Sequence, residues 1–156
     1  MDPETPAIRA IAGAAVAYEV MRTRPASSAE ESAELQGIAL GQLVRTIVIR
    51  RDQDDYVFVL VPGGWQIDWP KLRAHLRVKR LSLPDADEAR AATGYERGAI
   101  TPFGSTTAWP VLADASVREL DRVAIGGGIR GVNLHLDPSD LIGALGAEVA
   151  DLTRPA

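Results

Sequence analysis

The stretch Thr93-Gly94-Tyr95-Glu96-Arg97-Gly98-Ala99-Ile100-Thr101-Pro102-Phe103-Gly104 lies between a polar, helix-like segment and an apolar, strand-like one. Its three glycines can adopt positive φ or allow another molecule to approach the backbone closely. Pro102 fixes φ and removes one amide donor, so the loop is stiff as well as tight. A second cluster, Gly126-Gly127-Gly128-Ile129-Arg130-Gly131, follows further along the chain. Spacing alone leaves two interpretations open: two loops that line one ligand cleft, or two ordinary tight connections.

Length and composition bound the class of protein. The 156 residues indicate one domain covering residues 1–156, and 46% hydrophobic with 24% charged residues is typical of a soluble globular protein. No apolar run approaches the roughly 18 residues that a membrane helix needs, and the alanine-rich start lacks the basic leader of a signal peptide. The chain has no cysteine and only two histidines, which excludes thiolate chemistry and disfavours a metal site. We therefore expect a cytoplasmic protein without a metal, a cofactor or a membrane partner.

Charge is distributed unevenly along the chain. The net charge of −4 gives no overall attraction to nucleic acid, so any contact with a polyanion has to be local. Five cations fall within the segment Lys71–Arg80, which is either a solvated helix face or a contact with RNA. The neighbouring Trp65 and Trp69 likewise either stack on a nucleotide base or bury apolar area against a hairpin.

Helix and strand signals alternate along the whole chain. Caps and turn residues predict helices at residues 3–14, from Ser28 onward, at 69–76 and 84–92, and from Asp137 to about 145. Apolar and β-branched runs predict strands at residues 15–20, 43–49, 56–61, 78–81, 99–100, 109–113, 122–125 and 132–136. His135 alternates with two leucines and is predicted to lie on the surface. The fold class is α/β (α+β), one domain on a mixed, largely antiparallel sheet.

Four segments together resemble the YbaK / prolyl-tRNA synthetase-associated editing domain family, in its free-standing form. They are Leu43-Val44-Arg45-Thr46-Ile47-Val48, the loop from Thr93 to Gly104, Trp109-Pro110-Val111-Leu112-Ala113-Asp114, and Gly127-Gly128-Ile129-Arg130-Gly131. Their order and spacing also fit, and the similarity covers about residues 7–152. The resemblance implies a curved mixed sheet flanked by helices.

The resemblance also implies an activity, which is hydrolysis in trans of the ester that joins a wrong amino acid to tRNA, commonly tRNA for proline. The expected partners are the acceptor end of tRNA and prolyl-tRNA synthetase. Such an ester is already activated, so hydrolysis needs a placed water and a stabilised oxyanion more than a strong nucleophile. Backbone amides of two glycine loops can supply this without a metal or a thiol. The alternative from another class is a binding module, without catalysis, for the tRNA end or for a synthetase.

Carried onto this sequence, the family motifs nominate the site residues. The predicted catalytic residues are Arg45, Gly98, Thr101 and Gly104. The predicted substrate-binding residues are Thr46, Pro102, Phe103, Gly127, Gly128, Arg130 and Asn133.

Three positions depart from the family pattern. Arg45 stands where the family usually has lysine, Asn133 where it often has aspartate, and Thr23 aligns loosely with a frequent tyrosine. Arginine keeps the charge but cannot act as a neutral base. An arginine on an apolar strand has to meet an anion, which is either a ligand phosphate or an internal carboxylate such as Asp114. These replacements indicate either a shifted amino-acid specificity or a loss of catalysis.

Overall fold

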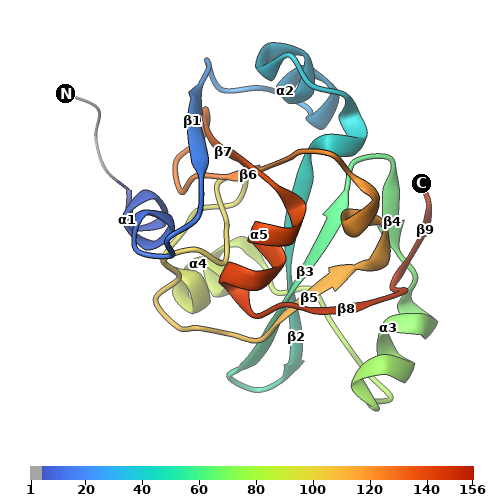
Figure 1. The fold of residues 1–156 in the computed structure, drawn as a ribbon. Helices are drawn as coiled ribbons and strands as arrows, with labels where there is room; N and C mark the ends of the chain where they lie inside the picture. The colour runs from blue at the N-terminus through green and yellow to red at the C-terminus, as the bar shows by residue number, and fades with distance from the viewer. Residues whose placement is uncertain (1–4) are drawn as a thin grey trace.

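The hairpin of β2 (Val44–Asp52) and β3 (Asp55–Pro62) forms the centre of the fold in the computed structural model, which describes residues 5–156 (Figure 1). The two strands pair antiparallel from Val44 opposite Pro62 to Asp52 opposite Asp55. All of β3 beyond Asp55 is buried, as expected for a continuous apolar run in a central strand. On its other side β3 pairs in parallel with β5 (Val111–Asp114), which pairs in parallel with β8 (Glu148–Ala150).

A second, antiparallel sheet lies against the first. Its strands are ordered β1 (Tyr18–Arg22), β7 (Val132–Leu136) and β6 (Val123–Gly126). A single parallel bridge between Leu43 and Ala124 connects the two sheets at the start of β2. The short strands β4 (Trp65–Ile67) and β9 (Thr153–Pro155) form a third, two-stranded sheet. The mixed, largely antiparallel architecture that the sequence predicts is therefore confirmed.

Helices cover the sheets, and side-chain caps begin most of them. The helices are α1 (Pro6–Ala12), α2 (Ala29–Gln36), α3 (Trp69–Leu76), α4 (Ala86–Thr93) and α5 (Pro138–Leu145), with 3-10 turns η1 (Leu40–Gln42) and η2 (Ala115–Glu119). The hydroxyl of Ser28 accepts from the Glu31 N–H, and the carboxylate of Asp68 accepts from the Lys71 N–H. These caps satisfy amide groups that a helix start leaves free. Both helices begin at the predicted residues, so both predicted starts are confirmed. No helix within residues 5–156 is long and apolar enough to cross a membrane.

Several predicted element boundaries are wrong. Residues 78–81 and 99–100 form no strand. Ser82, one residue beyond the first of these segments, forms an isolated antiparallel bridge with Arg50. Residues 94–108 are held by turn and side-chain bonds instead, such as that from the Tyr95 hydroxyl to the Phe103 carbonyl. Of the predicted helix 3–14, residues 3 and 4 lie outside the described residues and the helix itself covers 6–12.

Two apolar clusters flank the central sheet. One lies between the two larger sheets and includes Phe58, Leu60 and Leu134, and the other lies under α3 around Leu72. His135, predicted at the surface, is only 6% exposed because α2 packs over β7 at that position, with Gln36 against its ring. That prediction is wrong because strand alternation does not show that a helix covers the outer face.

Candidate active site

A cavity of about 690 Å³ opens at the outer edge of β2. Its walls come from the segment that leads into α2, from β2, from the start of α4, and from the two glycine-containing loops. The residues that line it are 23, 26–29, 32, 43–48, 83, 84, 89, 97, 98, 100, 126 and 130–133. A volume of this size is typical of a site for a small molecule or for the end of a larger ligand.

The charged side chains that line this cavity have one sign. Within the described part of the chain, the only charged side chains that line it are Arg45, Arg97 and Arg130. The remaining polar side chains of the lining are neutral hydroxyls and one amide. They belong to Thr23, Ser27, Ser28, Ser32, Thr46 and Asn133. In a chain with a net charge of −4, such a site attracts an anion and offers hydrogen bonds to a polar ligand.

Arg45 lies half-buried on β2, where one nitrogen, Nη2, donates to the backbone carbonyl of Trp65. Its Nε is buried and has no hydrogen-bond partner within residues 5–156. Burial lowers the pKa of the Arg45 guanidinium, and the Glu30 carboxylate opposes that shift; the group stays charged at neutral pH. A buried charge with spare donors is costly unless it meets an anion.

Asp114 is not that anion. Its carboxylate accepts from the Leu152 N–H at 2.9 Å and from the backbone and hydroxyl of Ser116, so it caps η2 and anchors the chain after β8. Burial raises the pKa of Asp114, but these hydrogen bonds outweigh burial and the pKa is lowered overall. The internal-carboxylate alternative for Arg45, as far as it names Asp114, is therefore wrong.

Thr46 adds an unsatisfied group to the same wall. Its Oγ1 is buried and has no hydrogen-bond partner among the described residues, and the side chain lines the cavity. Buried hydroxyls are nearly always paired, so an orphan beside a cavity indicates a ligand group that completes it. Asn133, half-buried on β7, also lines the cavity and lies opposite Gly126 in the β6–β7 pair.

Arg130 and two glycines hold three walls of the cavity together. Arg130 donates from Nη2 to the Ala26 carbonyl at 2.9 Å, and its stem lies beside Gly98, where a Cβ would stand 3.6 Å from Arg130 Cδ. Gly131 has φ +85° and packs against Thr23, whose N–H donates to the Gly131 carbonyl at 2.8 Å. A Cβ at Gly131 would lie 2.5 Å from the Thr23 oxygen, so only glycine fits.

The other predicted site residues lie outside the cavity lining and support the loops from behind. Thr101 and Phe103 are buried, and the Thr101 hydroxyl accepts from the Phe103 N–H. Gly104 packs on α1, where a Cβ would lie 2.4 Å from the Pro6 carbonyl. The remaining three behave alike: Pro102, Gly127 and Gly128 are not part of the lining, and the Gly127 carbonyl accepts from the Thr5 hydroxyl at 2.6 Å. Their placement gives their predicted catalytic or binding roles no support.

Sequence reasoning missed several residues of the lining. Arg97 lies within the glycine-rich loop, where no motif distinguishes it, and Ser27 and Ser32 carry no signal beyond that of the nearby helix start. Leu83 and Pro84 enter the cavity from the segment after α3. The capping box at Ser28 marks the start of α2 in the sequence, but a cap signal does not show which cavity the helix borders.

Known proteins are similar to this chain in sequence and in fold. Residues 23–144 match the family described as the aminoacyl-tRNA editing domain. A candidate Cys-tRNA(Pro)/Cys-tRNA(Cys) deacylase, EbsC of Enterococcus faecalis, is 26% identical over 136 residues, which are 87% of this chain and 83% of that protein. The proline–tRNA ligase of Thermosipho melanesiensis is 26% identical over 70% of this chain, but the match covers only 19% of the ligase.

A solved structure has the same fold as this chain. The crystal structure of a candidate trans-editing enzyme for prolyl-tRNA synthetase superposes with a TM-score of 0.88 at 26% identity, covering 98% of this chain and 99% of that one. The family match and the fold thus define a protein of the aminoacyl-tRNA editing class. The chain belongs to the aminoacyl-tRNA editing domain family, and it is an enzyme of the aminoacyl-tRNA hydrolase class.

Proposed function

We propose that this protein is a trans-editing deacylase that acts in the cytoplasm on mischarged tRNA, with tRNA for proline as the substrate to be tested first. The cavity would receive the aminoacyl-adenosine end of the acceptor arm. The observation that carries this proposal is that arginines are the only charged side chains that line the cavity in residues 5–156. A terminal nucleotide brings a phosphate to such a site, and Arg45 has a free buried donor to meet it.

The lining favours catalysis by positioning. No carboxylate or imidazole of the described chain lines the cavity, so a side-chain base of those kinds is not available there. Hydrolysis adds water to the ester carbonyl, breaks the bond to the ribose oxygen, and releases the amino acid while the ribose hydroxyl is restored. Holding water and ester in a reactive geometry lowers the barrier without a strong nucleophile. Backbone N–H groups of the loop at Gly98 and hydroxyls such as Thr46 can stabilise the oxyanion.

The relatives indicate the amino acid to test. EbsC is described as acting on Cys-tRNA(Pro) and Cys-tRNA(Cys). Cysteine and alanine fit a small side-chain pocket, and size alone separates such substrates only by about 1–3 kcal/mol per methylene. We therefore propose that a small side chain is removed, with cysteinyl-tRNA as the first candidate.

The test is deacylation of a panel of tRNAs by the purified protein. The panel holds cysteinyl-, alanyl- and seryl-tRNA(Pro) beside correctly charged prolyl-tRNA(Pro). Release of one small amino acid by the parent, and its loss in Arg45→Ala, supports the proposal. Arg51→Ala is the matched control, because Arg51 also lies on β2 but pairs with Asp55 away from the cavity. If nothing is released while tRNA still binds, the deacylase proposal fails and the binding module remains.

A further inference from the structure

Helix α3 has two cationic flanks, and one of them is neutralised. Lys71 Nζ contacts the Asp151 carboxylate at 3.0 Å and the Thr153 carbonyl at 3.1 Å. One turn later, His75 Nε2 lies 3.0 Å from Glu148 on β8. This flank therefore faces β8 and the chain that follows it, and the charge of Lys71 is matched by Asp151.

The other flank has no such partners. Arg73 lies on the side of the helix away from Lys71 and His75, Arg77 is the left-handed C-cap of α3, and Lys79 and Arg80 follow it. None of these four side chains makes an ion pair or a side-chain hydrogen bond within residues 5–156. Strand β8 lies at one edge of the sheet ordered β2-β3-β5-β8. Because the flank with Lys71 and His75 faces β8, the flank with Arg73 faces away from that edge of the sheet.

The chain after this flank leads into the cavity. Ser82 and Arg50 exchange both backbone hydrogen bonds, at 2.8 and 3.1 Å, so the segment lies along the outer edge of β2. The next residues, Leu83 and Pro84, line the cavity, and Leu83 is 60% exposed at its mouth. The unmatched cations are thus continuous with the proposed substrate site.

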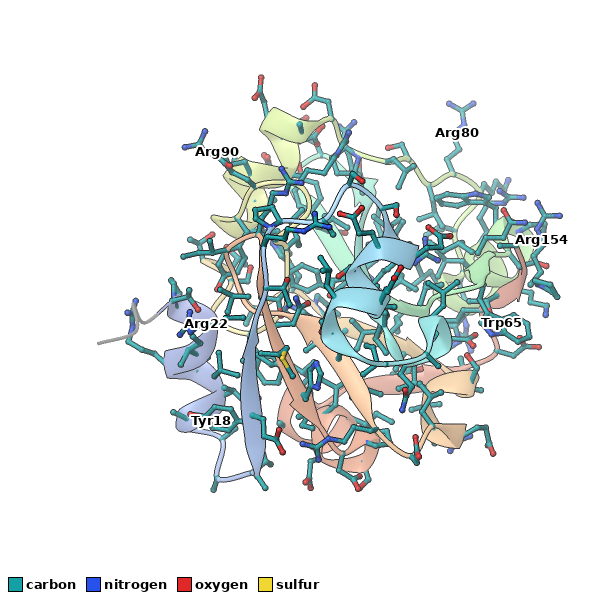
Figure 2. All side chains as sticks on the ribbon, turned by 90° about the horizontal axis from the view of Figure 1, so that it is seen from above. Tyr18, Arg22, Trp65, Arg80, Arg90 and Arg154 are labelled. Atoms are coloured by element: carbon teal, nitrogen blue, oxygen red, sulfur yellow. The ribbon has the colours of Figure 1, made fainter. Side chains whose placement is uncertain are left out.

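Trp65 and Arg154 lie near these unmatched cations (Figure 2). The Trp65 carbonyl accepts from Arg45, while the residue as a whole is 37% exposed. Arg154 on β9 pairs with Gln66 of β4, next to Trp65, and its side chain has no ion-pair partner within the described chain. Figure 2 shows Trp65, Arg80 and Arg154 on one side of the molecule and Arg90 on the other.

We propose that this basic surface binds the phosphate backbone of the tRNA acceptor arm while the aminoacyl end occupies the cavity. The basic surface is defined as Arg73, Arg77, Lys79, Arg80 and Arg154, together with Trp65. The proposal rests on the proposed function, since it names the surface that holds that substrate. Unmatched cations in a chain of net charge −4 have charge complementarity to a polyanion, and the exposed indole can stack on an unpaired base.

The test measures tRNA binding apart from catalysis. Uncharged tRNA(Pro) transcript is titrated by fluorescence anisotropy at several salt concentrations with the parent and with Arg77→Gln/Lys79→Gln. Losing two phosphate contacts should raise Kd roughly tenfold at low salt and reduce the salt slope by about 2. The control is Arg90→Gln/Arg118→Gln, which removes two exposed cations elsewhere and should bind as the parent does.

A second readout separates this surface from the active site. The variant should raise KM for aminoacyl-tRNA and leave kcat, and the hydrolysis of aminoacyl-adenosine, unchanged. Parent-like tRNA affinity and salt slope in the variant overturn the proposal and leave an acidic protein as the partner of this face. A parent that binds tRNA through this surface but hydrolyses nothing supports the surface and contradicts the deacylase.

Discussion

The guanidinium of Arg45 on β2 donates to the backbone carbonyl of Trp65 on β4. This bond joins the cavity wall to the edge of the basic surface, and it leaves Nε of Arg45 buried and free. A residue held by one nitrogen and available through another is oriented toward its ligand before the ligand binds, which reduces the entropy lost on binding.

Two replacements of Arg45 distinguish the role of its positive charge from the role of its guanidinium shape. We expect Arg45→Lys to keep deacylation within about tenfold, because the cation remains, and Arg45→Ala to lose about 100-fold in kcat/KM through the lost charged hydrogen bonds. Deacylation kinetics on the substrate found in the panel measure both. Activity that only Arg45→Lys possesses, with none in the parent, would instead identify the parent as a binding module.

Thr46→Val tests the orphan hydroxyl of the cavity wall. Because Oγ1 of Thr46 has no partner within residues 5–156, we expect the free energy of unfolding to change by less than about 0.5 kcal/mol, while KM rises. The matched control is Thr93→Val, since the buried Thr93 hydroxyl donates to the Ala89 carbonyl at 2.8 Å. That variant should lose about 1–3 kcal/mol in urea denaturation. Equal losses of stability in the two variants would contradict a ligand role for Thr46.

Gly104→Ala tests whether this predicted catalytic glycine is structural. Its φ is +70° and a Cβ would meet the Pro6 backbone at 2.4 Å, so we expect destabilisation of about 2–4 kcal/mol in urea denaturation. Gly64→Ala is the control: φ is +85° but no atom lies within 4 Å of the Cβ position, so only the backbone strain of about 1–2 kcal/mol applies. A stable Gly104→Ala protein that has lost activity would reverse this assignment.

His135 makes stability depend on pH. Burial lowers the pKa of His135, the Arg122 charge lowers it further, and Glu19 opposes both; Gln36 Oε1 lies 2.8 Å from its Nε2. The unfolded chain, with a histidine pKa of about 6.5, then binds the proton first, so stability is lost as pH falls below that value toward the folded-state pKa. Thermal melts between pH 7.5 and 5 should show this loss.

The His135→Gln variant isolates that contribution. Glutamine is neutral throughout this range and can still donate to Gln36, so the loss of Tm between pH 7 and 5 should shrink. His75→Gln should keep it, because His75 lies 3.0 Å from Glu148 on the other side of the fold. A pH dependence that His135→Gln leaves unchanged would contradict the assignment.

Local signals in the sequence predicted the helix starts and the central hairpin. Asp68 before Trp69 and Pro70 placed α3 at residues 69–76, because a cap satisfies amides within its own turn. The sequence identifies both glycine-rich loops, but it does not show which of their glycines face the cavity. Gly98 faces the cavity and Gly104 faces α1, a difference that depends on which element packs on each side.

By itself the sequence determined the mixed α/β class and the family, because these depend on residue type, order and spacing along the chain. Tertiary structure alone decided that Asp114 caps η2 instead of pairing with Arg45, and that His135 is buried. It also decided that three arginines from distant segments meet at one cavity. Such contacts join residues far apart in sequence, and their energies depend on packing and burial that no local pattern encodes.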